Sequence, residues 1–483
     1  MYVILIFSLF LTIPFYNSYN ITISYITKYI ISMLIFTIIL DISSIDFFNI
    51  FVFNEFFIIN SYTFIYRTFI NFVFIYIIIG IPLYYIKYFN YEFFILYIFC
   101  IIGVVGIICT NDYFGIYVFI ELQSFVIYLF CSIVIKNKYT IMASIQYFFI
   151  GSFASIIILL GIALLYYSIG NTSMIWSFNY LYILDINYYT SSIVILSFVF
   201  IIFGLLIKIG YAPFHIWTIN VYSNTPIIIT NIIMNIPKLS ILYILFNIIF
   251  NISIISINFI NLIFSFFIIF GFIIGSISPY GISNIKKILT YSTINQLGFI
   301  TIPFIICNFN SIFIFWFYLI QYIIVNITIF NFIINITYRY DFKYIYMFSS
   351  IFHFNKYYAF LFFINILSII GIPPLIGFIA KYYSLMLCFY NGSYIISYIG
   401  IFTSIISCYF YLNIIKYILF TDNIYSVNNS NVYFNSNFTA IYSALISTIS
   451  IFVIFGFLYI TNIQYFIHLI NYNLFYLFIY HDN

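Results

Sequence analysis

Apolar residues dominate this chain in runs of about 20, separated by short polar stretches that carry most of its charges. A helix of that length crosses the ~30 Å hydrocarbon core of a bilayer, because each helical residue adds about 1.5 Å. Inside the bilayer every backbone polar group must bond within the protein, which favours helices over open strands. The pattern therefore predicts an all-α polytopic membrane protein.

Fourteen runs are apolar enough to be predicted as transmembrane helices. They are residues 2–16, 24–40, 65–88, 93–110, 113–135, 142–168, 192–222, 226–250, 256–279, 286–306, 311–337, 357–388, 394–420 and 440–461. The stretch 41–63, which holds Asp41, is expected to be an external loop.

Basic residues test this helix count, since they favour the inner side of a membrane. With the N-terminus outside, ten of the fourteen fall in inside loops or at inside helix ends, and only Arg67 is clearly outside. The loops that hold Lys136–Lys138, Lys286–Lys287 and Arg339–Lys343 should then share one face.

Two predicted spans, the seventh and the twelfth, are overlong and contain helix breakers. Interior proline removes a helix hydrogen bond and clashes with the preceding turn, so both helices should break. The breakers are Gly210 and Pro213 in span 192–222, and Gly371, Pro373 and Pro374 in span 357–388.

The two breaks lie five spans apart, which suggests a pair of inverted five-helix repeats, the fourth to eighth and the ninth to thirteenth spans. This predicts four parts: residues 1–91 with three helices, 92–252 as the first repeat, 253–420 as the second, and 421–483 as a last helix and tail.

Composition excludes several classes of protein. Hydrophobic residues make up 66% of the chain and charged residues 5%, against about 25% charged in soluble domains. A soluble enzyme, a nucleic-acid-binding protein and a disordered chain are therefore excluded.

The 66 Phe and 53 Tyr indicate an A/T-rich genome such as an organelle's, so aromatic stripes carry little information. The six cysteines lack metal-ligand spacing and are expected to be free thiols.

Four ionisable residues interrupt the apolar spans: Glu121, Lys208, Lys238 and Lys381. A charge at the bilayer centre costs about 2.5–3.5 kcal/mol on insertion scales, so such residues usually have a function. Desolvation disfavours a charged lysine, and a nearby carboxylate favours it. Movement of Glu121 would switch a lysine between binding and releasing a proton, which predicts a proton relay. A static ion pair that orients helices is the alternative.

His215 follows the first break and is a secondary candidate for the relay. Its alternative is a hydrogen-bonded structural role. The chain has no Gly-rich nucleotide motif and no haem-type histidine pair, so no cofactor is expected in it.

Several motifs in combination resemble the antiporter-like membrane subunits of respiratory complex I, specifically the subunit 2 family (N in bacteria). They are Glu121–Ser124 (ELQS), the segment 147–166, the run KIGYAPFHIW at 208–217, Pro237–Lys238, NIKKILTYS at 284–292 and LSIIGIPPLIGFIAK at 367–381. Gln296 departs from this resemblance, because the tenth-helix motif of the family carries histidine there.

The resemblance implies that Glu121, Lys208, Lys238 and Lys381 form the proton relay of the family, with His215 and Gln296 as secondary members. It implies a proton-translocating subunit of NADH:ubiquinone oxidoreductase that is driven by quinone reduction elsewhere. FMN, iron–sulfur clusters and quinone would be bound by other subunits. The implied partners are other complex I membrane subunits, with subunits 4 and 4L as neighbours, and lipids of the mitochondrial inner membrane. A stand-alone or Mrp-type cation/proton antiporter and a non-pumping membrane anchor are the alternatives.

Overall fold

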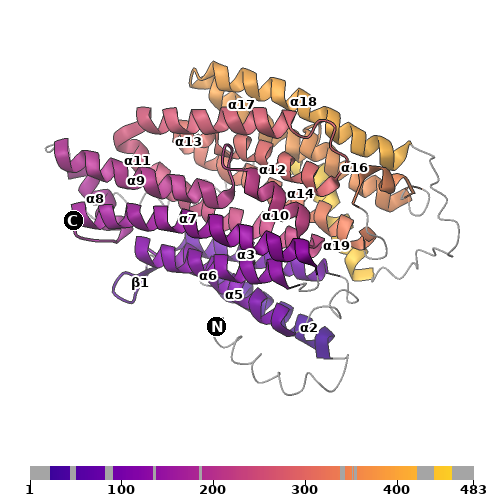
Figure 1. The fold of residues 1–483 in the computed structure, drawn as a ribbon, viewed down its shortest axis with the longest axis horizontal. Helices are drawn as coiled ribbons and strands as arrows, with labels where there is room; N and C mark the ends of the chain where they lie inside the picture. The colour runs from indigo at the N-terminus through magenta and orange to yellow at the C-terminus, as the bar shows by residue number, and fades with distance from the viewer. Residues whose placement is uncertain are drawn as a thin grey trace. The chain divides into compact units, whose positions relative to one another are not determined.

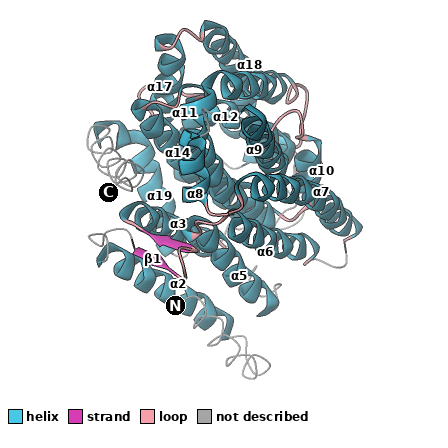
Figure 2. Ribbon diagram, turned by 90° about the vertical axis from the view of Figure 1, so that its left-hand side faces the viewer, coloured by secondary structure: helices cyan, strands magenta, loops and turns pink. Residues whose placement is uncertain are grey.

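The computed structural model describes residues 22–43, 50–81, 91–133, 137–183, 188–337, 343–350, 352, 356–420 and 440–459. The chain divides into two compact units, described separately: residues 1–260 with 469–483, and residues 261–468. Within the described ranges, eleven helices are long and apolar enough to cross a membrane. This confirms a predominantly helical, multi-pass membrane fold, and the strands in these ranges form one small hairpin (Figure 2).

The first unit is a bundle of helices. They are α2 (Thr22–Ser43), α3 (Ser61–Ile79), α5 (Tyr91–Cys109), α6 (Tyr113–Ser132), α7 (Lys138–Ile169), α8 (Met174–Ile183), α9 (Tyr188–Ile209), α10 (Ile216–Asn224) and the first part of α11 (Ile227–Ile277). Helix α6 packs against α5 and α7, and α7 packs against α9 (Figure 1). Helix α7 therefore links the helix that carries Glu121 to the helix that carries Lys208.

The hairpin of strands β1 (Ile50–Val52) and β2 (Phe57–Ile59) precedes α3 and lies against α3 and α5. Helix α3 begins at Ser61, four residues before the predicted span. The reason is a capping box, in which Asn60 accepts from the backbone N–H of Thr63 and the Thr63 side chain accepts from Asn60 N.

Helix α11 differs from the prediction. It joins the expected spans 226–250 and 256–279 in one helix of 51 residues, and the boundary between the two units falls within it. No glycine or proline occurs between Pro237 and Gly271, so the sequence offers no strong breaker at the expected turn.

The second unit is organised around α14. Its elements after α11 are α12 (Ile285–Thr301), α13 (Pro303–Ile306), α14 (Phe309–Thr337), the 3₁₀ turn η2 (Ile345–Ser350), α16 (Lys356–Ile370), α17 (Ile376–Tyr390), α18 (Tyr394–Leu419), α19 (Ala440–Phe455) and η3 (Gly456–Tyr459). Helix α14 packs against α12, α16, α17 and α19, which makes it the centre of this unit.

Both predicted helix breaks are confirmed. Helix α9 ends at Ile209 and α10 begins at Ile216, while α16 ends at Ile370 and α17 begins at Ile376. Gly210 and Gly371 have φ angles of 73° and 86°, a left-handed conformation that glycine adopts without a steric penalty.

Asp41 does not lie in the expected external loop. Helix α2 continues to Ser43, and Asp41 is 7% exposed because its carboxylate pairs with the guanidinium of Arg67 on α3. Glu121 is therefore not the sole carboxylate within a candidate span, and Arg67 lies within one as well. The predicted span 2–16 lies outside the described residues.

The basic residues Lys286–Lys287 and Lys343 of the second unit lie at the same end, as predicted. Ile285 N donates to Lys343 O at 3.1 Å, and Ile345 N donates to Ser283 O at 2.9 Å. These bonds bring Lys286–Lys287, at the start of α12, beside Lys343.

Candidate functional site

The first site is an ion pair between α6 and the end of α9. Lys208 lies in the last turn of α9, two residues before Gly210, and its Nζ donates to Oε1 of Glu121. The exposed fractions of the two side chains are 5% and 18%. Ser124 Oγ donates to Glu121 O at 2.9 Å and lies 3.4 Å from Glu121 Oε2. The predicted contact between Glu121 and a buried lysine is confirmed, and this lysine is Lys208.

A small cavity adjoins Lys208 and has room for about one water molecule. It is lined by Ile120, Gln123, Ser124, Ile127, Tyr128, Tyr147, Gly151, Lys208, Pro237 and Ile241. Gln123 Oε1 accepts from Ser240 Oγ at 2.9 Å, which ties α6 to α11 beside the cavity. The lining of this water-sized space is mostly apolar, and it adjoins the buried ammonium of Lys208.

Lys238 is 2% exposed and follows Pro237, one of the residues that line this cavity. The structure therefore places Lys238 within the same unit as Lys208, although it does not line the cavity itself. His215 does not line it either. Nδ1 of His215 lies 3.1 Å from Pro213 O within the break, an arrangement that favours the structural role.

The second site lies at the other break. Lys381, on α17, is 6% exposed, and its Nζ donates to Ile370 O, the last carbonyl of α16, at 2.7 Å. The same ammonium lies 5.4 Å from the ring centroid of Phe299. Carbonyl groups at a helix C-terminus carry partial negative charge, so this position suits a cation. Among the described residues Lys381 has no carboxylate partner.

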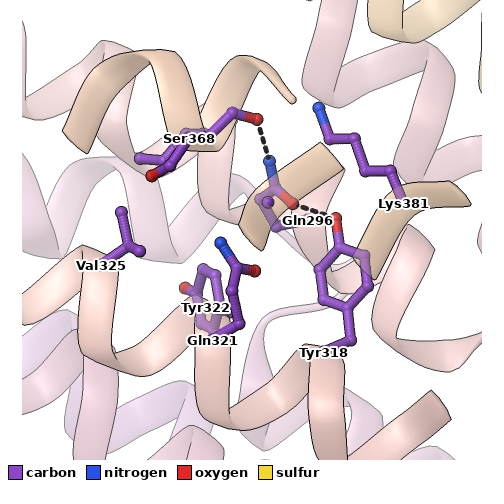
Figure 3. Close-up of a pocket in the computed structure, with 9 residues that line it drawn as sticks. Gln296, Tyr318, Gln321, Tyr322, Val325, Ser368 and Lys381 are labelled. Carbon is purple, nitrogen blue, oxygen red and sulfur yellow. Dashed lines mark hydrogen bonds between the residues drawn. The ribbon is translucent and has the colours of Figure 1, made fainter. Parts of the chain in front are cut away.

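Gln296, on α12, reaches the same helix end (Figure 3). Its Nε2 donates to Ile369 O at 3.3 Å, and its Oε1 accepts from the hydroxyl of Tyr318 on α14. Gln296 and Lys381 thus bond to consecutive carbonyl groups of α16, and both line one small cavity together with Gln321.

Tyr318 and Gln321 were not singled out from the sequence. The spacing of Tyr318, Gln321, Tyr322 and Val325 places them on one helical face, and all four line the cavity. The sequence feature that could have indicated this cavity was Gln321, a polar residue in the middle of an apolar span. Within the described ranges, no group of three or more His, Cys, Asp or Glu residues could hold a metal ion.

The fold and its two buried-lysine sites define a helical membrane subunit of the antiporter-like class. A family model described as NADH:quinone oxidoreductase/Mrp antiporter, transmembrane, matches residues 110–407, and the chain belongs to this family.

Similar proteins agree with this assignment. NADH-ubiquinone oxidoreductase chain 2 of Rhizopus oryzae is 30% identical over 412 residues, which cover 78% of this chain and 77% of that protein. NADH-quinone oxidoreductase subunit N of Orientia tsutsugamushi (strain Ikeda) is 28% identical over 362 residues, or 74% of this chain and 75% of the relative. A chain of respiratory complex I from Thermus thermophilus with bound aureothin has the same fold, with a TM-score of 0.74, 15% identity and coverage of 95% and 97%.

Proposed function

We propose that this chain is a proton-translocating subunit of the membrane arm of an NADH:quinone oxidoreductase, the counterpart of chain 2 and subunit N of its relatives. The observation that carries the proposal is the hydrogen-bonded ion pair of Lys208 and Glu121 at a broken helix. A buried lysine and a carboxylate that can separate and rejoin give a switch for binding and releasing a proton.

The relay begins at Glu121 and Lys208, includes Lys238 in the same unit, and reaches Lys381 at the second break. Three features support it: the burial of the three lysines, the water-sized cavities beside Lys208 and Lys381, and the break next to each of these two. Gln296 takes part as a hydrogen-bonding neighbour of the Lys381 site, and His215 stays a secondary candidate. The parts 92–252 and 253–420 would act as two repeats, each with one broken helix.

The chain holds no cofactor in this proposal, and quinone reduction in other subunits drives the relay. Its partners are further membrane subunits of a large hetero-oligomeric complex, with subunits 4 and 4L as the expected neighbours, and lipids. Mitochondrial relatives such as the Rhizopus chain and the A/T-rich composition support the mitochondrial inner membrane as its location.

NADH-driven proton pumping by the assembled complex tests this proposal. Lys208→Ala should abolish most proton pumping while the complex still assembles and reduces quinone, because Glu121 loses its titratable partner. Normal pumping by this variant would contradict the relay and favour a membrane anchor. Migration of the chain without flavin and iron–sulfur subunits on a native gel would favour the Mrp-type antiporter.

A further inference from the structure

The hydrogen bonds around Gln296 fix the orientation of its amide at both ends. Ile369 O is a backbone carbonyl and can only accept, so the amide NH₂ group must face it. The amide oxygen therefore faces Tyr318, whose hydroxyl donates to it (Figure 3). Tyr318 is 1% exposed and Gln296 is 5% exposed, so neither contact competes with bulk water.

This chain of bonds holds the Gln296 amide on the carbonyl group next to the one that receives Lys381. The last carbonyl groups of a helix have no partner within the helix, and each is a potential acceptor for a nearby ammonium. Leu367 O accepts from Gly371 N and Ile372 N, and Ile369 O accepts from Gln296. Because the Gln296 amide is held on Ile369 O, it does not compete for the next carbonyl group, Ile370 O, to which the Lys381 ammonium donates at 2.7 Å.

We propose that Tyr318 is a positioning residue for Lys381: it holds the Gln296 amide on Ile369 O, and thereby reserves Ile370 O for the Lys381 ammonium. The inference rests on the proposed function, because it assumes that Lys381 gains and loses a proton during pumping. The step itself moves one proton from Nζ to a water molecule in the adjoining cavity as the hydrogen bond to Ile370 O breaks, and a proton returns from water to Nζ when this bond forms again. Gln296 and Tyr318 keep their own protons throughout, as do the other titratable groups beside Lys381, the Cys408 thiol and the Tyr322 hydroxyl.

The chemistry of Gln296 suits this task. An amide donates and accepts at once and carries no charge, so it secures the end of α16 without repelling an ammonium beside it. A residue that gained a positive charge at this position would oppose protonation of Lys381, and one that gained a negative charge would hold the proton in place.

Proton pumping as a function of pH, measured in the assembled complex, tests the proposal. Tyr318→Phe removes one hydroxyl and frees the amide of Gln296. The freed amide can then turn to Ile370 O and compete with the Lys381 ammonium for this acceptor, so the pH range of pumping should shift to lower values. Gln296→Glu should shift the range in the opposite direction, because a carboxylate near Lys381 holds the proton.

Tyr358→Phe is the matched control. The Tyr358 hydroxyl accepts from Asn335 Nδ2 at 3.2 Å in the same unit, so this variant also removes a bond between a tyrosine and an amide. Tyr358 does not line the Lys381 cavity. We expect it to leave the pH range of pumping unchanged.

Two outcomes would overturn the inference: a Tyr318→Phe profile that matches the Tyr358→Phe profile, or shifts in the same direction for Tyr318→Phe and Gln296→Glu. A lower amount of assembled complex without a pH shift would also overturn it, because it would assign Tyr318 a structural role alone. Lys208→Ala, measured in parallel, separates the two claims. If it stops pumping while the Tyr318 profile is unchanged, this inference fails and the proposed function stands.

Discussion

The side chain of Lys381 lies so close to Gly371 that a methyl group on this glycine would sit 2.9 Å from Lys381 Cδ. Carbon atoms pack at about 3.5–4.0 Å, so an alanine would displace the lysine. The lysine thus folds back over the helix break, where it reaches Ile370 O.

Gly371→Ala should therefore impair both stability and proton pumping. The left-handed conformation alone costs an alanine about 1–2 kcal/mol, which should lower the thermal stability of the purified complex. The added methyl group should move Lys381 off its acceptor and reduce pumping per NADH oxidised. Gly392→Ala is the control, because Gly392 has a φ of 73° and no other atom within 4 Å of such a methyl group. Equal pumping by the two variants would show that Lys381 does not depend on this space.

Lys208→Arg should be almost as damaging to pumping as Lys208→Ala. A guanidinium keeps the positive charge near Glu121 but does not release a proton at physiological pH. The measurement is proton pumping by the assembled complex, with quinone reduction followed in the same sample. Wild-type pumping by the arginine variant, with alanine inactive, would mean that Lys208 is a fixed charge and the ion pair is static.

Glu121→Gln should also stop most pumping. The amide has nearly the shape of the carboxylate and can still accept a hydrogen bond from Lys208, but it cannot attract the proton electrostatically. Glu92→Gln, an exposed site in the first turn of α5, controls for the loss of one negative charge. Pumping should persist in that variant. A Glu121→Gln complex that pumps like the control would remove Glu121 from the relay.

Arg67→Met should destabilise the complex without a specific effect on pumping. It removes the guanidinium that pairs with the carboxylate of Asp41, whose side chain is 10% exposed. Removing one partner of a buried pair costs about 3–5 kcal/mol. Thermal unfolding of the purified complex measures the loss, and the double variant Asp41→Asn/Arg67→Met should recover part of it. No recovery would indicate that Arg67 stabilises the protein mainly through other contacts.

The sequence predicted those features whose physical penalties are large and local. A charge in an apolar span needs compensation, and this requirement pointed to Glu121 and Lys208 before any geometry was available. Gly and Pro inside overlong spans predicted both helix breaks for a similar reason.

Features that depend on packing between distant segments were missed. Tyr318 is one of 53 tyrosines, and its role depends on how α14 packs against α12. Asp41 was expected in a loop because its partner, Arg67, is 26 positions away. The uninterrupted α11 was missed because a turn was assumed where the sequence carries no breaker.

The indole of Trp217 bonds to a backbone acceptor beside Lys208 in the first unit. Its indole Nε1 donates to Ile207 O at 3.2 Å, and Gly210 N donates to the same carbonyl at 3.0 Å. The backbone acceptor next to Lys208 thus has two donors, and the Lys208 ammonium donates to Glu121. Lys208 therefore donates its hydrogen bond to a carboxylate, which can itself be protonated. Lys381 donates to the backbone carbonyl group of Ile370, which cannot. In the proposed relay, the first unit would exchange a proton between two titratable groups, and the second would hold a single proton on Lys381.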